Sequence, residues 1–236
     1  MNLLVCDLDG TLTRTFAVDE ECFVQAFIDV FDVRDLNTQW MEYEHVTDLG
    51  VLQQVFRERF NRAPGRDDMM RFAECFTGLL ADRYSRGGDP FTEIPGAASL
   101  LTKLAIHPRW RVAIATGGMA ASAKFKLHKA PLPADDIPIA SAEDGPSREA
   151  IVRTAVERAK KHYAEVHFER IVSVGDALWD VRTARRLDLP FVGVATGQRA
   201  ARLRDNGATT IIEDFLNYPH CMTCFESAGV PAHRYF

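Results

Sequence analysis

The chain has 236 residues, of which 47% are hydrophobic, so it can bury a sizeable core as one large domain or as one domain with an insert. Its 28 basic and 33 acidic residues leave a net charge of −5, which argues against a surface built to bind nucleic acid or an anionic membrane. The N-terminal residues lack the pattern of a secretion signal, and no apolar run approaches the roughly 20 residues that span a bilayer. We therefore expect a soluble, cytoplasmic protein.

Short runs that are apolar on both faces recur along the chain, as is typical of buried parallel strands. They predict strands at residues 3–6, 112–115, 137–140, 171–174 and 191–195, and a weaker one at 209–212. Helical spacing of apolar residues predicts helices at 97–104, 120–128, 148–162, 179–187 and 200–205. This alternation indicates an α/β fold with a parallel sheet covered on both faces, whose ligands bind near the carboxyl ends of the strands.

The stretch from residue 15 to residue 91 breaks this alternation, because it shows helical patterns and no convincing strand. Helices are predicted at 22–31, 48–60 and 67–84, and their aromatic stripes indicate the core of a small bundle. Glycine and proline residues at 86–90 and 95–96 predict the return to the main domain. We therefore divide the chain into an α/β core of residues 1–14 and 92–236 and a helical insert of residues 15–91.

The strongest chemical signal is Asp7-Leu8-Asp9-Gly10-Thr11, directly after the first strand. If the chain bends at Gly10, both carboxylates can reach one small space. One can then act as a nucleophile and hold a cation, while the other protonates a leaving oxygen and later activates water. A plain turn or a calcium loop is the alternative, but the residues after Gly10 do not supply the further oxygen ligands of a calcium loop.

Three further segments carry residues that suit phosphate chemistry. Thr116-Gly117-Gly118 follows a predicted strand, where a hydroxyl and glycine amides can cradle phosphate oxygens. Arg148, near the start of a helix, can offset negative charge in a transition state. Asp176 and Asp180 begin at a strand end and run into a helix, and their oxygens suit Mg²⁺. Each segment alone is equally compatible with an ordinary strand end, a solvated arginine or a helix cap.

Together the four segments resemble the motifs of the haloacid dehalogenase-like hydrolase superfamily, in the same order and at the ends of separate strands. The family's DxDGT is similar to residues 7–11, its strand ending in Ser or Thr to 112–116, its Lys or Arg to Arg148, and its GDxxxD to 175–180. The resemblance implies a Rossmann-like core with an inserted helical cap of the C1 type, in the branch of the phosphoglycolate phosphatases. It covers about two thirds of the chain.

The resemblance also implies a role for each matching residue. Asp7 would attack phosphorus and become an aspartyl phosphate, and Asp9 would be the general acid and base. Asp7, the main-chain carbonyl of Asp9, Asp176 and Asp180 would hold Mg²⁺. Thr116, Gly117 and Gly118 would bind phosphate, and Arg148 would steady the nucleophile and the phosphate. The implied activity is hydrolysis of a small phosphorylated metabolite by a phosphoric monoester hydrolase.

Two departures from the family pattern concern the third motif and the substrate. Many capped members have Lys-Pro-x-Pro where this chain has Ser147-Arg148-Glu149, and Arg14-Thr15 replaces the common Val/Ile-Asp-Ser. Substrate choice should lie in the insert, and Thr47 in the loop before the second predicted helix is our candidate contact. Thr47 serving only as the N-cap of that helix is an equal alternative.

Other functions remain open at this stage. A phosphosugar mutase would use the same residues, and a binding protein on a hydrolase core would need none of them. A dehalogenase does not require Asp9, and a phosphonatase would want a lysine in residues 15–91, which contain none. A response-regulator receiver lacks the long insert.

The C-terminal segment contains His220, Cys221, Cys224 and His233, which raises the question of a zinc site. A second cysteine pair at suitable spacing is missing, so we expect a reduced tail that packs on the core.

Overall fold

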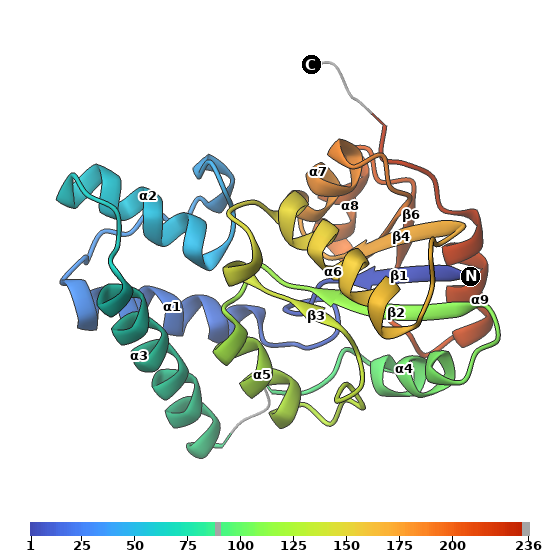
Figure 1. Cartoon of the computed structure of the whole chain (residues 1–236), viewed down its shortest axis with the longest axis horizontal. Helices are drawn as coiled ribbons and strands as arrows, with labels where there is room; N and C mark the ends of the chain where they lie inside the picture. The colour runs from blue at the N-terminus through green and yellow to red at the C-terminus, as the bar shows by residue number, and fades with distance from the viewer. Residues whose placement is uncertain (88–90, 233–236) are drawn as a thin grey trace.

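The computed structural model describes residues 1–87 and 91–232, and within them a six-stranded parallel sheet forms the centre of the molecule (Figure 1). The strand order is β3-β2-β1-β4-β5-β6. The strands are β1 (Asn2–Cys6), β2 (Trp110–Ala115), β3 (Ile139–Ala140), β4 (Arg170–Gly175), β5 (Phe191–Val194) and β6 (Thr210–Ile212). This arrangement confirms the α/β fold class predicted from the alternation of elements. β3 has only two of the four residues predicted.

Helices cover both faces of the sheet, as a parallel sheet requires. The helices outside the insert are α4 (Ala97–Ala105), α5 (Ala120–Lys129), α6 (Arg148–His162), α7 (Leu178–Arg186), α8 (Gly197–Asp205) and α9 (Tyr218–Ser227). α4 and α9 share one hydrophobic cluster with Leu4 and Cys6 of β1, whereas α6 packs on Leu3 and Val5 of the opposite face. α7 and α8 pack together with Phe191 of β5. Because successive side chains of β1 point to opposite faces of the sheet, this strand contributes to the hydrophobic clusters on both faces.

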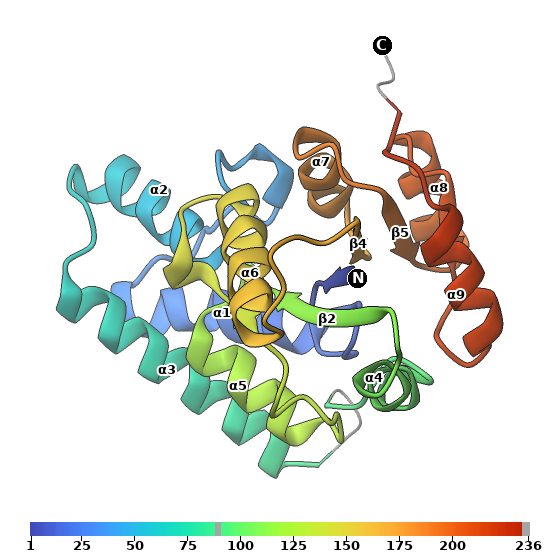
Figure 2. The same ribbon diagram turned by 45° about the vertical axis from the view of Figure 1, so that its right-hand side comes forward.

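The insert contains α1 (Phe16–Phe31), the short η1 (Trp40–Glu42), α2 (Asp48–Phe60) and α3 (Arg66–Ser85). Figures 1 and 2 show these helices beside the end of the sheet toward which the strands run. Their core is a separate cluster rich in phenylalanine, in which Phe23 packs edge-on against Phe27, Phe72 and Phe76. Met119 of the segment before α5 joins this cluster, so the insert packs directly against the core.

One helix of the insert begins earlier than the sequence predicts. α1 begins at Phe16 rather than at residue 22, because Val18 lies one turn before Cys22 on the buried face and Asp19 suits the positive end of a helix. The predicted turn at 86–90 falls partly on residues 88–90, which lie outside the described residues.

The C-terminal segment forms α9, which the sequence analysis did not predict. Asn217 caps the helix by accepting a hydrogen bond from the amide of His220, and Cys221, Cys224 and Phe225 face the core. The Sγ atom of Cys224 lies 3.6 Å from Nε2 of His220. His233 lies outside the described residues.

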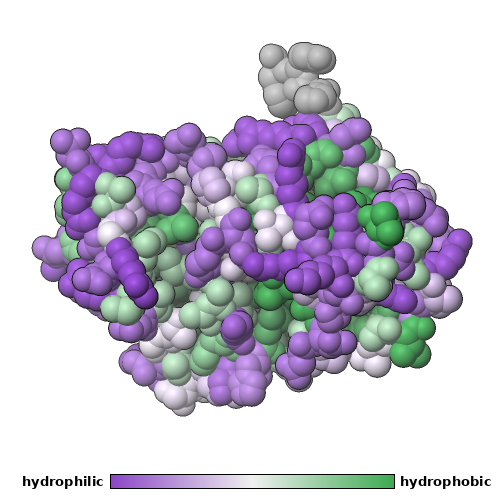
Figure 3. Space-filling model, viewed as in Figure 1, coloured by the Kyte–Doolittle hydropathy of each residue, from purple (hydrophilic) through white to green (hydrophobic). Residues whose placement is uncertain are grey.

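Hydrophilic residues dominate the face of the molecule in Figure 3, with small apolar patches between them. In the part of the chain that the structure describes, every helix is too short or too polar to cross a membrane.

Candidate active site

The carboxyl ends of three neighbouring strands bring the predicted site residues together. Cys6 of β1 pairs with Ile114 of β2 on one side and with Val174 of β4 on the other. The chain leaves these strands within one or two residues of the paired positions, so Asp7, Thr116 and Asp176 emerge at the same edge of the sheet. This edge is where parallel sheets bind ligands.

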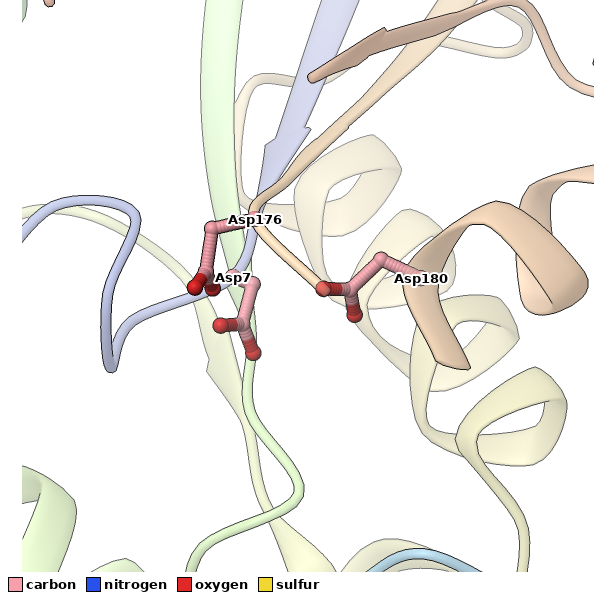
Figure 4. A group of neighbouring side chains, drawn as sticks. All are labelled: Asp7, Asp176 and Asp180. Carbon is pink, nitrogen blue, oxygen red and sulfur yellow. The ribbon is translucent and has the colours of Figure 1, made fainter. Parts of the chain in front are cut away.

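Asp7, Asp176 and Asp180 form a buried carboxylate cluster (Figure 4). Each offers an oxygen that lies within 4.8 Å of the other two, and all three side chains are buried. Burial and the neighbouring carboxylates raise the pKa of Asp7 to about 7, of Asp176 to about 7 and of Asp180 to about 6. Three carboxylates this close together fit a hard divalent cation such as Mg²⁺.

Gly10 allows the first motif to approach this cluster closely. Its φ of 87° lies in the left-handed region, and a Cβ at this position would overlap the carboxylate of Asp176. Thr11, in the same turn, donates from Oγ1 to Oδ1 of Asp176 at 3.2 Å. The bend predicted at Gly10 is therefore present, and it joins the first motif to the fourth.

Arg148, the predicted match to the third motif, contacts two of the three clustered aspartates. Its Nη1 atom is 3.2 Å from Oδ1 of Asp7 and 3.1 Å from Oδ1 of Asp180. Its Nε atom donates to the carbonyl of Val46 in the insert at 2.8 Å. The guanidinium lies so close to Gly117 that a Cβ there would be only 2.5 Å from Nη2, which explains the need for glycine after Thr116.

The Thr116-Gly117-Gly118 segment forms the wall beside Asp7. Thr116 is buried, and its hydroxyl accepts a hydrogen bond from the amide of Gly118 at 3.0 Å, which leaves the O–H free to donate. All three residues line the same hollow as Asp7 and Arg148.

Thr47 and Asp48 connect the insert to this wall. Thr47 caps α2 by accepting a hydrogen bond from the amide of Gly50 at 3.0 Å, and its hydroxyl donates to the carbonyl of Pro146 at 3.3 Å. The predicted N-cap is therefore present, and Thr47 also lines the hollow, where its contact with a substrate stays a prediction. The amide of Asp48 donates to the carbonyl of Gly117 at 2.8 Å, and its carboxylate accepts from the amide of Met119 at 2.8 Å. Burial raises the pKa of Asp48 to about 7.

Asp9 lies apart from the three-aspartate cluster and has its own partners. Its Oδ1 accepts a hydrogen bond from the hydroxyl of Thr15 at 2.5 Å, and its Oδ2 lies 2.6 Å from Nζ of Lys126. Asp9 lines the hollow together with Asp7, so the two carboxylates of the first motif face one space. Its side chain is not part of the cluster, and the predicted metal contact of Asp9 concerns its main-chain carbonyl instead.

The hollow above these residues has a volume of about 600 Å³, part of it open to solvent. The core supplies one part of the wall and the insert supplies the other. The insert residues that line it are Phe16, Asp19, Glu20, Phe23, Trp40, Val46, Thr47, Asp48 and Val51. The core and the insert therefore share one recess beside Asp7.

Comparison with known proteins agrees with the geometry. The sequence profile described as "Hydrolase: haloacid dehalogenase-like hydrolase" matches residues 1–188. The chain belongs to this family. A search of curated proteins gives no match.

Solved structures similar to this haloacid dehalogenase-like hydrolase share its fold at low sequence identity. A hydrolase from Pseudomonas syringae is 22% identical with a TM-score of 0.69, over 97% of this chain and 100% of that one. CbbY from Rhodobacter sphaeroides in complex with phosphate is 20% identical with a TM-score of 0.60, over 91% of this chain and 95% of that one. A putative β-phosphoglucomutase from Bacteroides vulgatus is 15% identical with a TM-score of 0.63, over 96% and 89%.

Two cations of this haloacid dehalogenase-like hydrolase were missed in the sequence. Lys126 of α5 is fully buried, and its Nζ lies 2.6 Å from both Asp9 and Asp19. Arg199 of α8 forms an ion pair with Oδ2 of Asp176. The sequence carried one signal for Lys126, because it lies on the same helix face as Ala123 and Ala130, which are buried.

Proposed function

We propose that this haloacid dehalogenase-like hydrolase is a Mg²⁺-dependent phosphatase that hydrolyses a small phosphorylated metabolite through an aspartyl phosphate on Asp7. The observation that carries the proposal is the position of Asp7, which lies in one buried cluster with Asp176 and Asp180 and 3.2 Å from Nη1 of Arg148. A nucleophilic carboxylate beside a cation site and a fixed guanidinium suits attack on a phosphate dianion.

Asp7, Asp176 and Asp180, with the carbonyl of Asp9, would hold the Mg²⁺, which when bound would neutralise charge on the phosphate. An oxygen of Asp7 attacks phosphorus, and the bond from phosphorus to the ester oxygen breaks. Asp9 gives its proton to the departing oxygen. Asp9 then takes a proton from a water molecule as that water attacks the aspartyl phosphate, which releases phosphate and restores Asp7.

The remaining residues bind and orient the substrate in this proposal. Thr116, Gly117 and Gly118 would donate to the phosphate oxygens, and Arg148 would hold Asp7 and the phosphate in place. Residues 15–91 would act as a cap, since Asp48 and Val46 of the insert bind Gly117 and Arg148 of the core directly. Thr47 would contribute to the part of the wall that selects the substrate.

Phosphate release from a panel of small phosphate monoesters tests the proposal. We expect release in Mg²⁺ and its loss in EDTA, because the metal would offset the negative charge that Asp7 and a phosphate dianion bring together. Restoring Mg²⁺ should restore the rate. No release from any ester by folded protein would contradict a phosphatase.

A phosphosugar mutase is the second candidate, because structures of both kinds share this fold and the same nucleophile would serve it. In that case a phosphosugar would be converted to its isomer while free phosphate stays low, which product analysis on the same panel distinguishes. A binding protein on a hydrolase core would show neither reaction.

Mg²⁺ should also stabilise the fold directly. We expect the melting temperature to rise with Mg²⁺, because an ion that binds only the folded state adds about 2.7 kcal/mol at 100 times its Kd. In Asp176→Asn this rise should be largely lost, while Asp135→Asn, an exposed position, should keep it. Differential scanning fluorimetry with and without Mg²⁺ measures the shift. An equal rise in Asp176→Asn and in the unaltered protein would place the ion elsewhere.

A further inference from the structure

The insert gives its part of the hollow an acidic character. Asp19 and Glu20 of α1 and Asp48 of α2 all line the hollow. Among the described residues that line it, Arg148 is the one cation, and its Nη1 is bound to Asp7 and Asp180 at the phosphate end. The part of the wall that would meet the leaving group therefore has carboxylates and no lining cation of its own.

The protein compensates these carboxylates only in part. Lys126, behind the wall, is shared between Asp9 and Asp19. Glu20 accepts a hydrogen bond from the indole of Trp40 at 2.5 Å, and Asp48 accepts one from the amide of Met119. These last two donors are neutral, so they orient the carboxylates without cancelling their charge. Since burial raises the pKa of Asp48 to about 7, Asp48 carries its full charge only above neutral pH. A carboxylate held in this way attracts a cation from the ligand.

An aromatic ring adjoins Glu20. Trp40 lies against Glu20 through its indole nitrogen and packs edge-on against Phe23, with ring centroids 6.0 Å apart. Both rings line the hollow. Aromatic faces beside carboxylates bind ammonium groups, because the ring quadrupole and the negative charge act in the same direction.

We propose that the substrate is the phosphate monoester of an amino alcohol, with its ammonium group held by the wall that Glu20, Trp40 and Asp48 form. This assignment rests on the proposed phosphatase function and adds the class of its leaving group. In the reaction the bond from phosphorus to oxygen breaks, Asp9 protonates the alcohol oxygen, and the ammonium group keeps its charge throughout. An ester whose leaving group carries a carboxylate or a second phosphate would meet only like charges on this wall.

Three esters of similar size isolate the effect of this charge. They are 2-aminoethyl phosphate, 2-hydroxyethyl phosphate and carboxymethyl phosphate, whose leaving groups are cationic, neutral and anionic. We expect kcat/KM to fall in that order, with about tenfold or more between the first and the last, since this corresponds to about 1.4 kcal/mol of charge preference. An equal or higher kcat/KM for the anionic ester would overturn the assignment.

Adjacent residues of α1 provide a matched pair of variants. Glu20→Gln keeps the acceptor for Trp40 but removes the charge, so the ratio of kcat/KM between the cationic and neutral esters should fall about fivefold. Glu21→Gln is the control, because Glu21 is exposed, pairs with Arg83 at 2.9 Å and does not line the hollow. Asp48→Asn should lower the ratio as Glu20→Gln does. If the unaltered protein and the three variants gave the same ratio of kcat/KM, the charge on this wall would not affect the choice of substrate.

Measuring how tightly the esters bind distinguishes an error in the assigned leaving group from an error in the proposed phosphatase function. If neither these three esters nor the wider panel is hydrolysed, the proposed phosphatase function is wrong, and calorimetric titration of the three esters into the Mg²⁺-loaded protein tests the acidic wall by itself. Tighter binding of 2-aminoethyl phosphate than of carboxymethyl phosphate, lost in Glu20→Gln, would support the acidic wall alone. Equal or reversed affinities would overturn it.

Discussion

Asp7→Asn should lower phosphate release by more than about 10⁴-fold, because the amide oxygen is a poor nucleophile and cannot form the aspartyl phosphate. The effect should appear in kcat. The substitution preserves shape and removes one charge from a buried cluster in which the carboxylates repel one another, so the protein should still fold. Steady-state rates and a thermal melt on the same preparation measure both quantities.

Two controls make the result specific to the nucleophile. Asp135→Asn, at an exposed position, should leave the rate unchanged. Intact-protein mass measured after rapid acid quenching should show a phosphorylated fraction in the unaltered protein and none in Asp7→Asn. Full activity in folded Asp7→Asn would contradict the covalent mechanism, whereas loss of both activity and fold would call for Asp7→Glu, in which the displaced carboxylate should also fail to turn over.

The sequence predicted the cluster because two of its three residues, Asp7 and Asp176, directly follow short apolar strands. Parallel strands place their carboxyl ends at one edge, so Asp7 and Asp176 had to meet once β1 and β4 were neighbours. Asp180 followed from helical spacing, since it lies four residues after Asp176. The roles of these residues stay predictions, but their proximity is a property of the fold.

Other features of the structure depend on contacts between residues that are distant in the sequence, so no local sequence pattern predicts them. Arg199 meets Asp176 from α8, the helix that follows the next strand, and its sequence neighbourhood is that of an ordinary solvated helix. α9 was missed because its polar residues obscure the spacing of Cys221, Cys224 and Phe225 on its buried face. An ion-pair or packing partner from a distant helix or strand can be identified only from the three-dimensional arrangement of the elements.

Lys126 is the clearest case of such a residue, and its replacement should be costly. Lys126→Met should lower the free energy of unfolding by about 3–5 kcal/mol, because it leaves Asp9 and Asp19 partly buried without their cation. Methionine is of similar length and fits a buried position, so a cavity contributes little. Urea unfolding followed by circular dichroism measures the change. The activity should fall too, since Lys126 and Thr15 between them hold both oxygens of Asp9.

α5 itself offers a control variant, and Asp19, an ion-pair partner of Lys126, offers a test of why stability is lost. Lys124 is exposed on α5, so Lys124→Met should change the stability by less than about 0.5 kcal/mol. If unpaired charge is the reason for the loss, adding Asp19→Asn to Lys126→Met should recover part of the stability, which makes the two substitutions non-additive. If the loss of stability in the double variant equals the sum of the two single losses, Lys126 acts by packing. If Lys126→Met is as stable as the unaltered protein, the buried ion pairs contribute no net stability. Lys126 has two proposed roles, stabilising the fold and positioning Asp9. If the double variant recovers stability but not the rate of phosphate release, the two roles are separate, because only the positioning of Asp9 requires the ammonium group itself.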